Sequence, residues 1–249
     1  MLVNGHNLYV ERHGQEKAPA VVLLHHGLGA VRAWKEQILT LVQAGFQVIA
    51  YDRWGYGKSD ARPALDLPTF AIDVQDLLSL LEQQGIQKAT LVGHSDGGTI
   101  ALYFATQYPE RVNCLVVIAA HIYVESKMEP SILGIKYAFD HDARFRVGLQ
   151  HAHGDQYERV FYNWFDGWHR IESLTWDMRP ILPKVHCPVL VAQGEKDEHA
   201  TPQHARDIAG CITGAELWLD PAAGHMLPQE NYETFNPRLL QFLNLHRDG

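Results

Sequence analysis

The chain has 249 residues, a length that fits one large domain or two small ones and is sufficient to bury a hydrophobic core. Hydrophobic residues make up 46% of the chain and charged residues 20%, which excludes a disordered, collagen-like or coiled-coil protein. The formal net charge is −8 and no run of Lys and Arg is longer than a pair, so we expect no nucleic-acid partner, because such binding requires a cationic surface.

The hydropathy pattern predicts neither a secretory signal nor a membrane-spanning segment. The first residues lack the basic start and apolar stretch of a secretory signal, and the longest apolar runs, residues 19–24 and 115–120, reach about a third of a membrane span. The three cysteines are far apart and form no C-x-x-C pair, so no disulfide framework is predicted. We therefore predict a cytoplasmic protein that does not associate with membranes.

Short runs rich in Val, Ile and Leu, each of the length of a buried strand, alternate with helical patterns. These runs lie at residues 20–24, 46–51, 89–92, 112–119, 189–192 and 216–219. The clearest helix is predicted over residues 69–84, where Asp73 and Asp76 lie off an apolar stripe of helical period. Weaker alternation near residues 8–12 indicates an antiparallel edge strand. The alternation predicts an α/β fold with a mostly parallel central sheet covered by helices on both faces, which binds ligands outside the carboxyl ends of its strands.

Residues 121–183 interrupt the alternation, because they contain no convincing strand but are dense in aromatic side chains. We interpret this segment as an inserted helical cap over the carboxyl edge of the sheet, with residues 1–120 and 184–249 forming the core. The alternative is a small subdomain that packs its aromatic residues into its own core. In the cap interpretation, Trp164 and Trp168 are candidate substrate-binding residues, since aromatic walls gain most by burying apolar groups.

The segment Gly93-His-Ser95-Asp-Gly97 has the G-x-S-x-G pattern and stands between a predicted strand and a predicted helix over residues 99–108. A nucleophile on a tight strand-to-helix turn requires small residues on both sides, and the start of the helix favours an oxyanion beside it. The alternative is a glycine-rich turn with an incidental serine.

A serine nucleophile requires a base and a group that orients the base. Asp197 and His225 lie in loops directly after the last two predicted strands, with Glu198 as a neighbouring alternative carboxylate. An oxyanion hole takes one N–H from the residue after the nucleophile, here Asp96, and a second from a loop after an earlier strand, for which Leu28 is the candidate. Taken singly, each of these residues also fits an ordinary loop or capping position.

Together these segments resemble the α/β-hydrolase superfamily over nearly the whole chain. The matching pieces are His26-Gly27, residues 51–59, residues 93–97, residues 194–197 and Gly224-His225. The chain order Ser95, Asp197, His225 is the order of the triad in that superfamily. The resemblance implies acyl transfer in two steps: His225 accepts the Ser95 proton, Ser95 attacks the carbonyl, and Asp197 fixes the histidine tautomer. Residues 52–59 resemble a Gly-rich loop that is structural in the family.

The Ser-Asp-Gly-Gly sequence also resembles hydrolases of amino-acid esters, in which the acidic residue after the nucleophile helps to hold the substrate's ammonium group. Alternatively, Asp96 is simply a favourable acidic residue in the first turn of a helix. Both interpretations are consistent with the sequence.

We therefore predict a serine hydrolase that cleaves the carboxylic ester of a small or medium, partly apolar substrate through an acyl-enzyme, without a cofactor, as a monomer or homodimer. A carbon–carbon bond hydrolase, a lyase or a perhydrolase on the same fold, and a non-catalytic binding protein, are the alternatives. A dienol-ketone substrate and a panel of esters would separate the ester hydrolase from the carbon–carbon bond hydrolase.

Histidines are unusually numerous, with 15 in the chain. His151-Ala-His153-Gly-Asp155 resembles the start of the H-x-H-x-D-H metal-ligand motif, but position 156 is Gln and the segment is predicted to be helical, so we predict no metal site there. His26 and His94 are expected to bind substrate or to support the site around His225.

Overall fold

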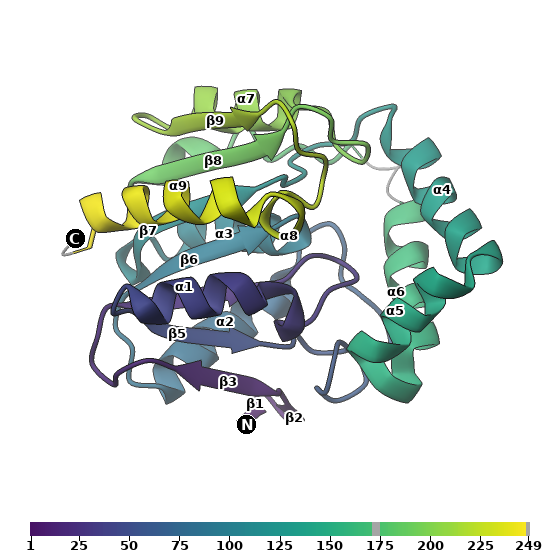
Figure 1. The fold of residues 1–249 in the computed structure, drawn as a ribbon, viewed down its shortest axis with the longest axis horizontal. Coiled ribbons are helices and arrows are strands. Elements are labelled where there is room, and N and C mark those ends of the chain that lie inside the picture. The colour runs from purple at the N-terminus through teal and green to yellow at the C-terminus, as the bar shows by residue number, and fades with distance from the viewer. Residues whose placement is uncertain (171–174, 248–249) are drawn as a thin grey trace.

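The computed structural model describes residues 1–170 and 175–247; residues 171–174 of the predicted insertion and residues 248–249 of the predicted core lie outside the described residues. Within this part of the chain, a seven-stranded sheet has the order β3-β5-β4-β6-β7-β8-β9 (Figure 1). The strands are β3 Val10–His13, β4 Ala20–Leu24, β5 Gln47–Tyr51, β6 Ala89–His94, β7 Val112–Ile118, β8 Val189–Gly194 and β9 Glu216–Asp220. All neighbours are parallel except β3, which pairs antiparallel with β5. The mostly parallel sheet and the antiparallel edge strand are as predicted.

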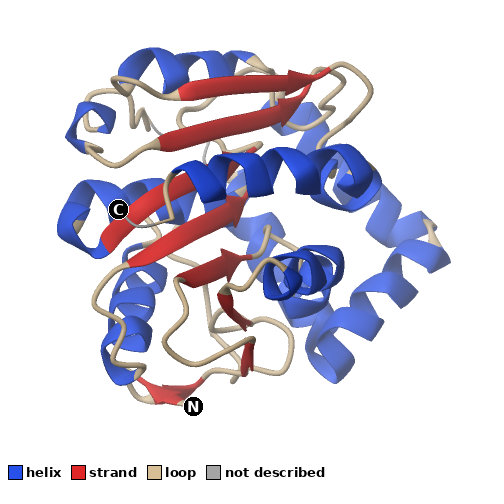
Figure 2. Cartoon of the chain, turned by 60° about the vertical axis from the view of Figure 1, so that its left-hand side comes forward, coloured by secondary structure: helices blue, strands red, loops and turns tan. Residues whose placement is uncertain are grey.

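The two faces of the sheet are covered by different helices, because successive residues of a strand point to opposite sides. On β4, Val21 and Leu23 pack with one buried cluster, which includes side chains of α1 (Lys35–Gln43) and α9 (Tyr232–Leu245). Val22 and Leu24 pack with the other, together with α2 (Ala71–Gln83), α3 (Asp96–Gln107) and α7 (Gln203–Cys211). Figure 2 shows helices on both sides of the strands.

The predicted helix over residues 69–84 corresponds to α2, and its apolar stripe is buried against the sheet. Asp73 and Asp76 lie off that stripe, yet both side chains are buried. Asp73 pairs with Arg53 and Arg62, and Asp76 accepts a hydrogen bond from the Asn4 amide and contacts the His6 ring. Periodicity alone predicts that this polar face of the helix is exposed to solvent, but partners from other segments of the chain cover it.

A short hairpin precedes the sheet and was not predicted. Strands β1 (Leu2–Val3) and β2 (His6–Asn7) pair antiparallel around Asn4-Gly5. Both turn residues have positive φ, 47° and 92°, the conformation for which Asn-Gly is favoured in two-residue hairpin loops.

Among the described residues between β7 and β8, three α-helices stand over the carboxyl ends of the strands (Figure 1). These cap helices are α4 (Met128–His141), α5 (Ala143–His153) and α6 (Tyr157–His169). The remaining short helices are η1 Val31–Trp34, η2 Pro109–Arg111, η3 Gly154–Gln156, η5 Leu182–Lys184 and α8 Leu227–Glu230. None of the helices in the described ranges is long and apolar enough to cross a bilayer.

Candidate active site

Ser95 occupies a tight turn between β6 and α3. Its backbone has φ 54° and ψ −118°, a strained conformation for a residue with a side chain. A Cβ atom on Gly93 would clash with the Gly97 carbonyl, and one on Gly97 would clash with the Leu24 carbonyl. The turn therefore closes only with glycine at both positions, as the G-x-S-x-G pattern predicts.

His225 and Asp197 meet in the loops after β9 and β8. The Nδ1 atom of His225 lies 3.0 Å and 3.1 Å from the two carboxylate oxygens of Asp197, whose side chain is fully buried. The backbone N–H groups of His199 and Ala200 also donate to that carboxylate, at 2.8 Å and 2.9 Å. Burial alone would raise the pKa of Asp197, but His225 and these hydrogen bonds lower it overall, so the group stays ionised.

Glu198, the neighbouring carboxylate, is placed differently. Its Oε2 accepts the backbone N–H of His225 at 3.2 Å, and its side chain is 56% exposed. It therefore holds the backbone of the histidine loop, while Asp197 holds the ring.

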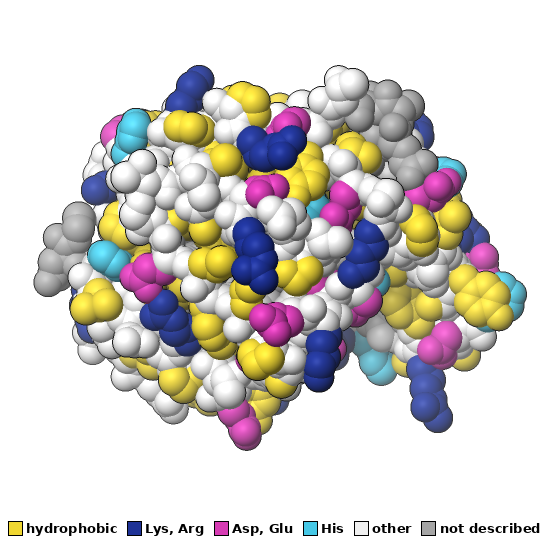
Figure 3. Space-filling view, turned by 90° about the horizontal axis from the view of Figure 1, so that it is seen from above, with side chains coloured by type: hydrophobic (Ala, Val, Ile, Leu, Met, Phe, Trp, Pro, Cys, Tyr) yellow, Lys and Arg dark blue, Asp and Glu magenta, His cyan; other side chains and the backbone are white. Residues whose placement is uncertain are grey.

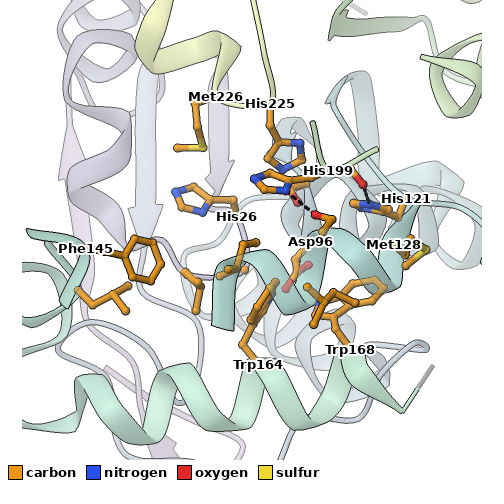
Figure 4. Close-up of a pocket in the computed structure, with 17 residues that line it drawn as sticks. His26, Asp96, His121, Met128, Phe145, Trp164, Trp168, His199, His225 and Met226 are labelled. Atoms are coloured by element: carbon orange, nitrogen blue, oxygen red, sulfur yellow. Dashed lines mark hydrogen bonds between the residues drawn. The ribbon is translucent and has the colours of Figure 1, made fainter. Parts of the chain in front are cut away.

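Ser95, His225 and both predicted oxyanion-hole residues, Leu28 and Asp96, line one cavity of about 310 Å³. As the first residue of α3, Asp96 has a backbone N–H with no acceptor inside its helix. Figure 4 shows His225 and Met226 on one side of the cavity, with Trp164 and Trp168 rising from α6 on the opposite side. The structure thus brings the predicted nucleophile, the histidine and the oxyanion loop to one space.

The cap helices supply the apolar wall of this cavity. Trp164 and Trp168, the candidate substrate-binding residues, both line it, one helical turn apart on α6. The remaining lining residues, on α4 and α5 and in the loops after β7, β8 and β9, were not assigned to the site from the sequence. They are Met128, Ser131, Ile132, Ile135, Phe145, Leu149, His121, His199 and Met226. The signal was available, because 128, 132 and 135 on α4, and 145 and 149 on α5, have the spacing of one helix face.

The two histidines predicted near the site have different roles. The His26 ring lines the cavity. His94 is fully buried instead, and its Nε2 donates a hydrogen bond of 2.8 Å to the backbone carbonyl of His225. His94 is not among the residues that line the cavity, so of its two expected roles, binding substrate or supporting the site, the structure fits the second: the last residue of β6 holds the histidine loop. Burial lowers the pKa of His94 to about 3, so its ring stays neutral.

Asp96 also faces the cavity with its side chain, which is 2% exposed. Its carboxylate lies 3.4 Å from the Arg53 guanidinium, which also contacts Asp73 at 3.2 Å. Burial raises the pKa of Asp96 to about 6, although Arg53 opposes that shift. Arg62 in turn pairs with Asp73 and Asp66. Because two guanidinium groups face three carboxylates, an ionised Asp96 leaves this cluster with one surplus negative charge.

The histidine motif at residues 151–155 lies at the end of α5, where the helical prediction is confirmed. The His151 side chain is exposed, whereas His153 is buried and hydrogen-bonded to core backbone groups of Gly57 and Leu28. Over residues 1–170 and 175–247, no three His, Cys, Asp or Glu side chains are arranged to hold a metal ion.

Known proteins resemble this chain along nearly its whole length. A sequence model described as the alpha/beta hydrolase fold matches residues 20–152. The chain is 33% identical to the serine hydrolase BPHL of Homo sapiens over 97% of its length and 84% of that protein. It is 27% identical to a 2-hydroxy-6-oxo-6-phenylhexa-2,4-dienoate hydrolase of Burkholderia cepacia, covering 95% of this chain and 92% of that one.

Among solved structures, an enol-lactonase from Burkholderia xenovorans superimposes with a TM-score of 0.80 at 24% identity, over 97% of this chain and 98% of that chain. That likeness concerns the fold alone. With the matched sequence model and the relative at 33% identity, it leads to one conclusion. The chain belongs to the alpha/beta hydrolase fold family.

Proposed function

We propose that this hydrolase is a serine esterase that cleaves a carboxylic ester through an acyl-enzyme on Ser95. One observation carries the proposal: Ser95, on a strained strand-to-helix turn, lines the same cavity as His225, whose ring is held by buried Asp197. The name of the human relative, a serine hydrolase, supports it. The combination matters because a serine at its ordinary pKa is a poor nucleophile.

In the proposed mechanism, His225 removes the Ser95 proton as the serine oxygen attacks the ester carbonyl. The backbone N–H groups of Leu28 and Asp96 stabilise the oxyanion that forms. His225 then protonates the departing alcohol, which leaves an acyl group on Ser95. Water, activated by His225, hydrolyses this acyl-enzyme and releases the acid. Asp197 keeps the proton on Nδ1 of His225 and favours the transient imidazolium without becoming protonated.

The cavity supports an ester with an apolar part of small or medium size. Its volume of about 310 Å³ is at the lower end of ligand sites, and its cap side consists of aliphatic and aromatic side chains. Asp96 adds one buried acidic group beside the nucleophile, which favours an ammonium group on the substrate. An α-amino ester with a hydrophobic side chain or alcohol meets both conditions.

Carbon–carbon bond hydrolysis is the second candidate, because relatives named for dienoate substrates align over nearly the whole chain. A dienoate carries a carboxylate, whose charge a cationic side chain in the site would neutralise. Of the described residues that line this cavity, none is Lys or Arg, and the ionisable carboxyl of Asp96 would repel an anion. The charge of the cavity therefore favours the ester.

Fluorophosphonate labelling tests the proposal directly, because the reagent forms an adduct with an activated serine. We expect wild-type protein to be labelled on Ser95 at neutral pH and Ser95→Ala to remain unlabelled. Hydrolysis is then measured with ester pairs that differ only in an α-amino group, beside a dienol-ketone substrate. A folded wild-type protein without an adduct would refute the serine mechanism, and turnover of the dienol-ketone alone would refute the ester.

A further inference from the structure

His153, the last residue of α5, bridges two loops of the core. Its side chain is buried, and its Nδ1 accepts the backbone N–H of Gly57 at 2.9 Å. Its Nε2 lies 3.1 Å from the backbone carbonyl oxygen of Leu28. Since Nδ1 accepts a hydrogen bond from a backbone amide, the neutral ring carries its proton on Nε2, which donates to Leu28. The geometry thus defines the tautomer.

This contact fixes the peptide group that follows Leu28. The N–H of that peptide belongs to Gly29 and donates to the His26 carbonyl at 3.0 Å, while its carbonyl accepts from His153. A peptide group is planar, so holding it at both polar atoms restricts rotation about the Leu28 Cα. The N–H of Leu28 lies on the other side of the same Cα, so its direction depends on how this peptide group is held.

We propose that His153 is a positioning residue of the oxyanion hole: it acts through the Leu28 carbonyl to keep the Leu28 N–H aimed at the developing oxyanion. This inference rests on the proposed esterase function. It makes the cap helix α5 a support of the transition state as well as a wall of the cavity, since a donor misplaced by a fraction of an ångström loses much of its effect.

A purely structural role would be to attach the cap to the core, and Gln156 provides the comparison. From η3, its side-chain amide donates to the carbonyl oxygens of Gly57 and Ser59, at 2.8 Å and 3.1 Å. Gln156 therefore holds the cap to the same Gly-rich loop that His153 contacts through Gly57. Because these two bonds bypass Leu28, Gln156→Leu is the matched control.

Two substitutions separate the two hydrogen bonds of His153. The amide of a glutamine reaches the place of Nε2, so His153→Gln keeps a donor for Leu28 and loses the acceptor for Gly57. The shorter asparagine reaches only the place of Nδ1, so His153→Asn keeps the acceptor for Gly57 and loses the donor for Leu28. Burial lowers the pKa of His153 to about 4, so the wild-type ring is neutral in assays near pH 7.

The experiment measures kcat and KM for p-nitrophenyl butyrate, with the inhibition constant of a trifluoromethyl ketone that forms an oxyanion on the serine. In His153→Asn we expect kcat to fall by about tenfold or more at nearly unchanged KM, part of the roughly 10²-fold effect of deleting a donor. Affinity for the ketone should fall in parallel. His153→Gln should stay within about threefold of wild type, and Gln156→Leu should keep its kcat even if its Tm drops.

Equal losses in His153→Asn and His153→Gln, or a kcat loss in Gln156→Leu as large as in His153→Asn, would overturn the proposal. If the asparagine variant does not fold, His153→Phe replaces it, because it keeps an aromatic ring beside Tyr56, whose ring centroid lies 6.1 Å from that of His153, and loses both hydrogen bonds. The phenylalanine variant should then show the same kcat loss.

Amide hydrogen exchange gives a readout that does not depend on esterase activity. We expect faster exchange at residues 26–29 in His153→Asn, and no change there in His153→Gln or Gln156→Leu. Unchanged exchange in the asparagine variant would show that His153 does not hold the loop. Absence of fluorophosphonate labelling in the wild-type protein would refute the proposed function instead, so the two failures are distinguishable.

Discussion

At the scale of single residues, Ser95 shows how the backbone prepares the site. A non-glycine residue in so unusual a conformation costs on the order of 1–3 kcal/mol, and the flanking glycines allow the close backbone approach that maintains it. The strain exposes the serine side chain at the carboxyl edge of the sheet, in the cavity that His225 also lines.

Substitutions of Ser95 and His225 should therefore be strongly non-additive. We expect Ser95→Ala and His225→Ala each to reduce kcat by more than about 10³-fold, and the double variant to be hardly slower than either, because the proton acceptor is useful only to the nucleophile. Steady-state kinetics on one ester measures this. Losses that multiply in the double variant would show that the two residues act independently.

Asp96 should control the preference for α-amino esters. We expect Asp96→Asn to reduce kcat/KM for an α-amino ester about tenfold relative to its des-amino analogue, because it removes the surplus negative charge. In the wild-type protein that preference should decline as pH falls through about 6, the pKa to which burial raises this carboxyl, since the proton neutralises it. A preference that is independent of pH, or unchanged in the asparagine variant, would contradict this role.

The sequence predicted the position of residues that depends on neighbouring residues in the chain. It missed the orientation and burial of side chains whose contacts come from distant parts of the chain. Ser95 follows a strand directly, and Asp197 and His225 lie in the short loops after two others, so their place at the carboxyl edge follows from the chain itself. His94 also ends a strand, but its direction depends on the loop of His225, 131 residues away. The burial of Asp96 depends likewise on Arg53, which no periodicity connects to it.

At the scale of elements, the cap helices carry glycines that do not serve packing. Gly134 on α4 and Gly148 on α5 are exposed, and a Cβ on either would meet no atom within 4 Å. Glycine inside a helix costs about 0.5–1 kcal/mol relative to alanine, through the greater backbone freedom of the unfolded chain.

We therefore expect Gly134→Ala and Gly148→Ala each to stabilise the protein by about 0.5–1 kcal/mol in denaturant unfolding. The comparison is Gly97→Ala, in which the new Cβ would clash with the Leu24 carbonyl, so that variant should lose stability and activity. A stability gain in Gly97→Ala, or a loss in both cap variants, would contradict the geometry of these helices.

The strands and helices of the core were predictable because the spacing of their apolar residues indicates which face is buried. In the cap the same signal was harder to interpret, because α4, α5 and α6 present apolar faces both to one another and to the cavity. The spacing of Met128, Ile132 and Ile135 shows that one face is apolar, and only the tertiary structure shows that it faces Ser95. The extent of the cap as a domain, the oligomeric state and the cytoplasmic location stay predictions.

At the scale of the whole molecule, charge is distributed rather than concentrated. On the face seen in Figure 3, basic and acidic side chains are interspersed. The interior has a different character, because several of the 15 histidines are buried and neutral. Burial lowers the pKa of His94 and His121 to about 3 and that of His153 to about 4, and it lowers those of His25 and His26 well below their usual value.

These histidines should make the protein unusually sensitive to mild acid. In the unfolded chain each titrates near pH 6.5, so below that pH the unfolded state binds protons that the folded state does not, and the free energy of unfolding falls. The loss continues until pH 3–4, where the folded state titrates as well. Asp96 acts in the opposite direction: burial raises its pKa to about 6, so near pH 5 its carboxyl binds a proton in the folded state that it releases in the unfolded state.

We expect a net uptake on the order of two or more protons on unfolding at pH 5, seen as a steep fall of stability between pH 6.5 and 5. Urea unfolding across that range measures it, and His153→Gln should reduce the slope by about one proton. A stability that is flat down to pH 5 would show that these rings are protonated in the folded protein.

The close approach of Gly27 and Trp164 links the sequence of the core to that of the insertion. A Cβ on Gly27 would clash with the Trp164 indole, so a residue of the core and one of the insertion, 137 positions apart, share one space. Neither can diverge freely: a larger residue at position 27 requires a smaller one at position 164. We therefore expect that an insertion taken from a relative with a bulky side chain at this place would fit best when the loop after β4 is exchanged with it.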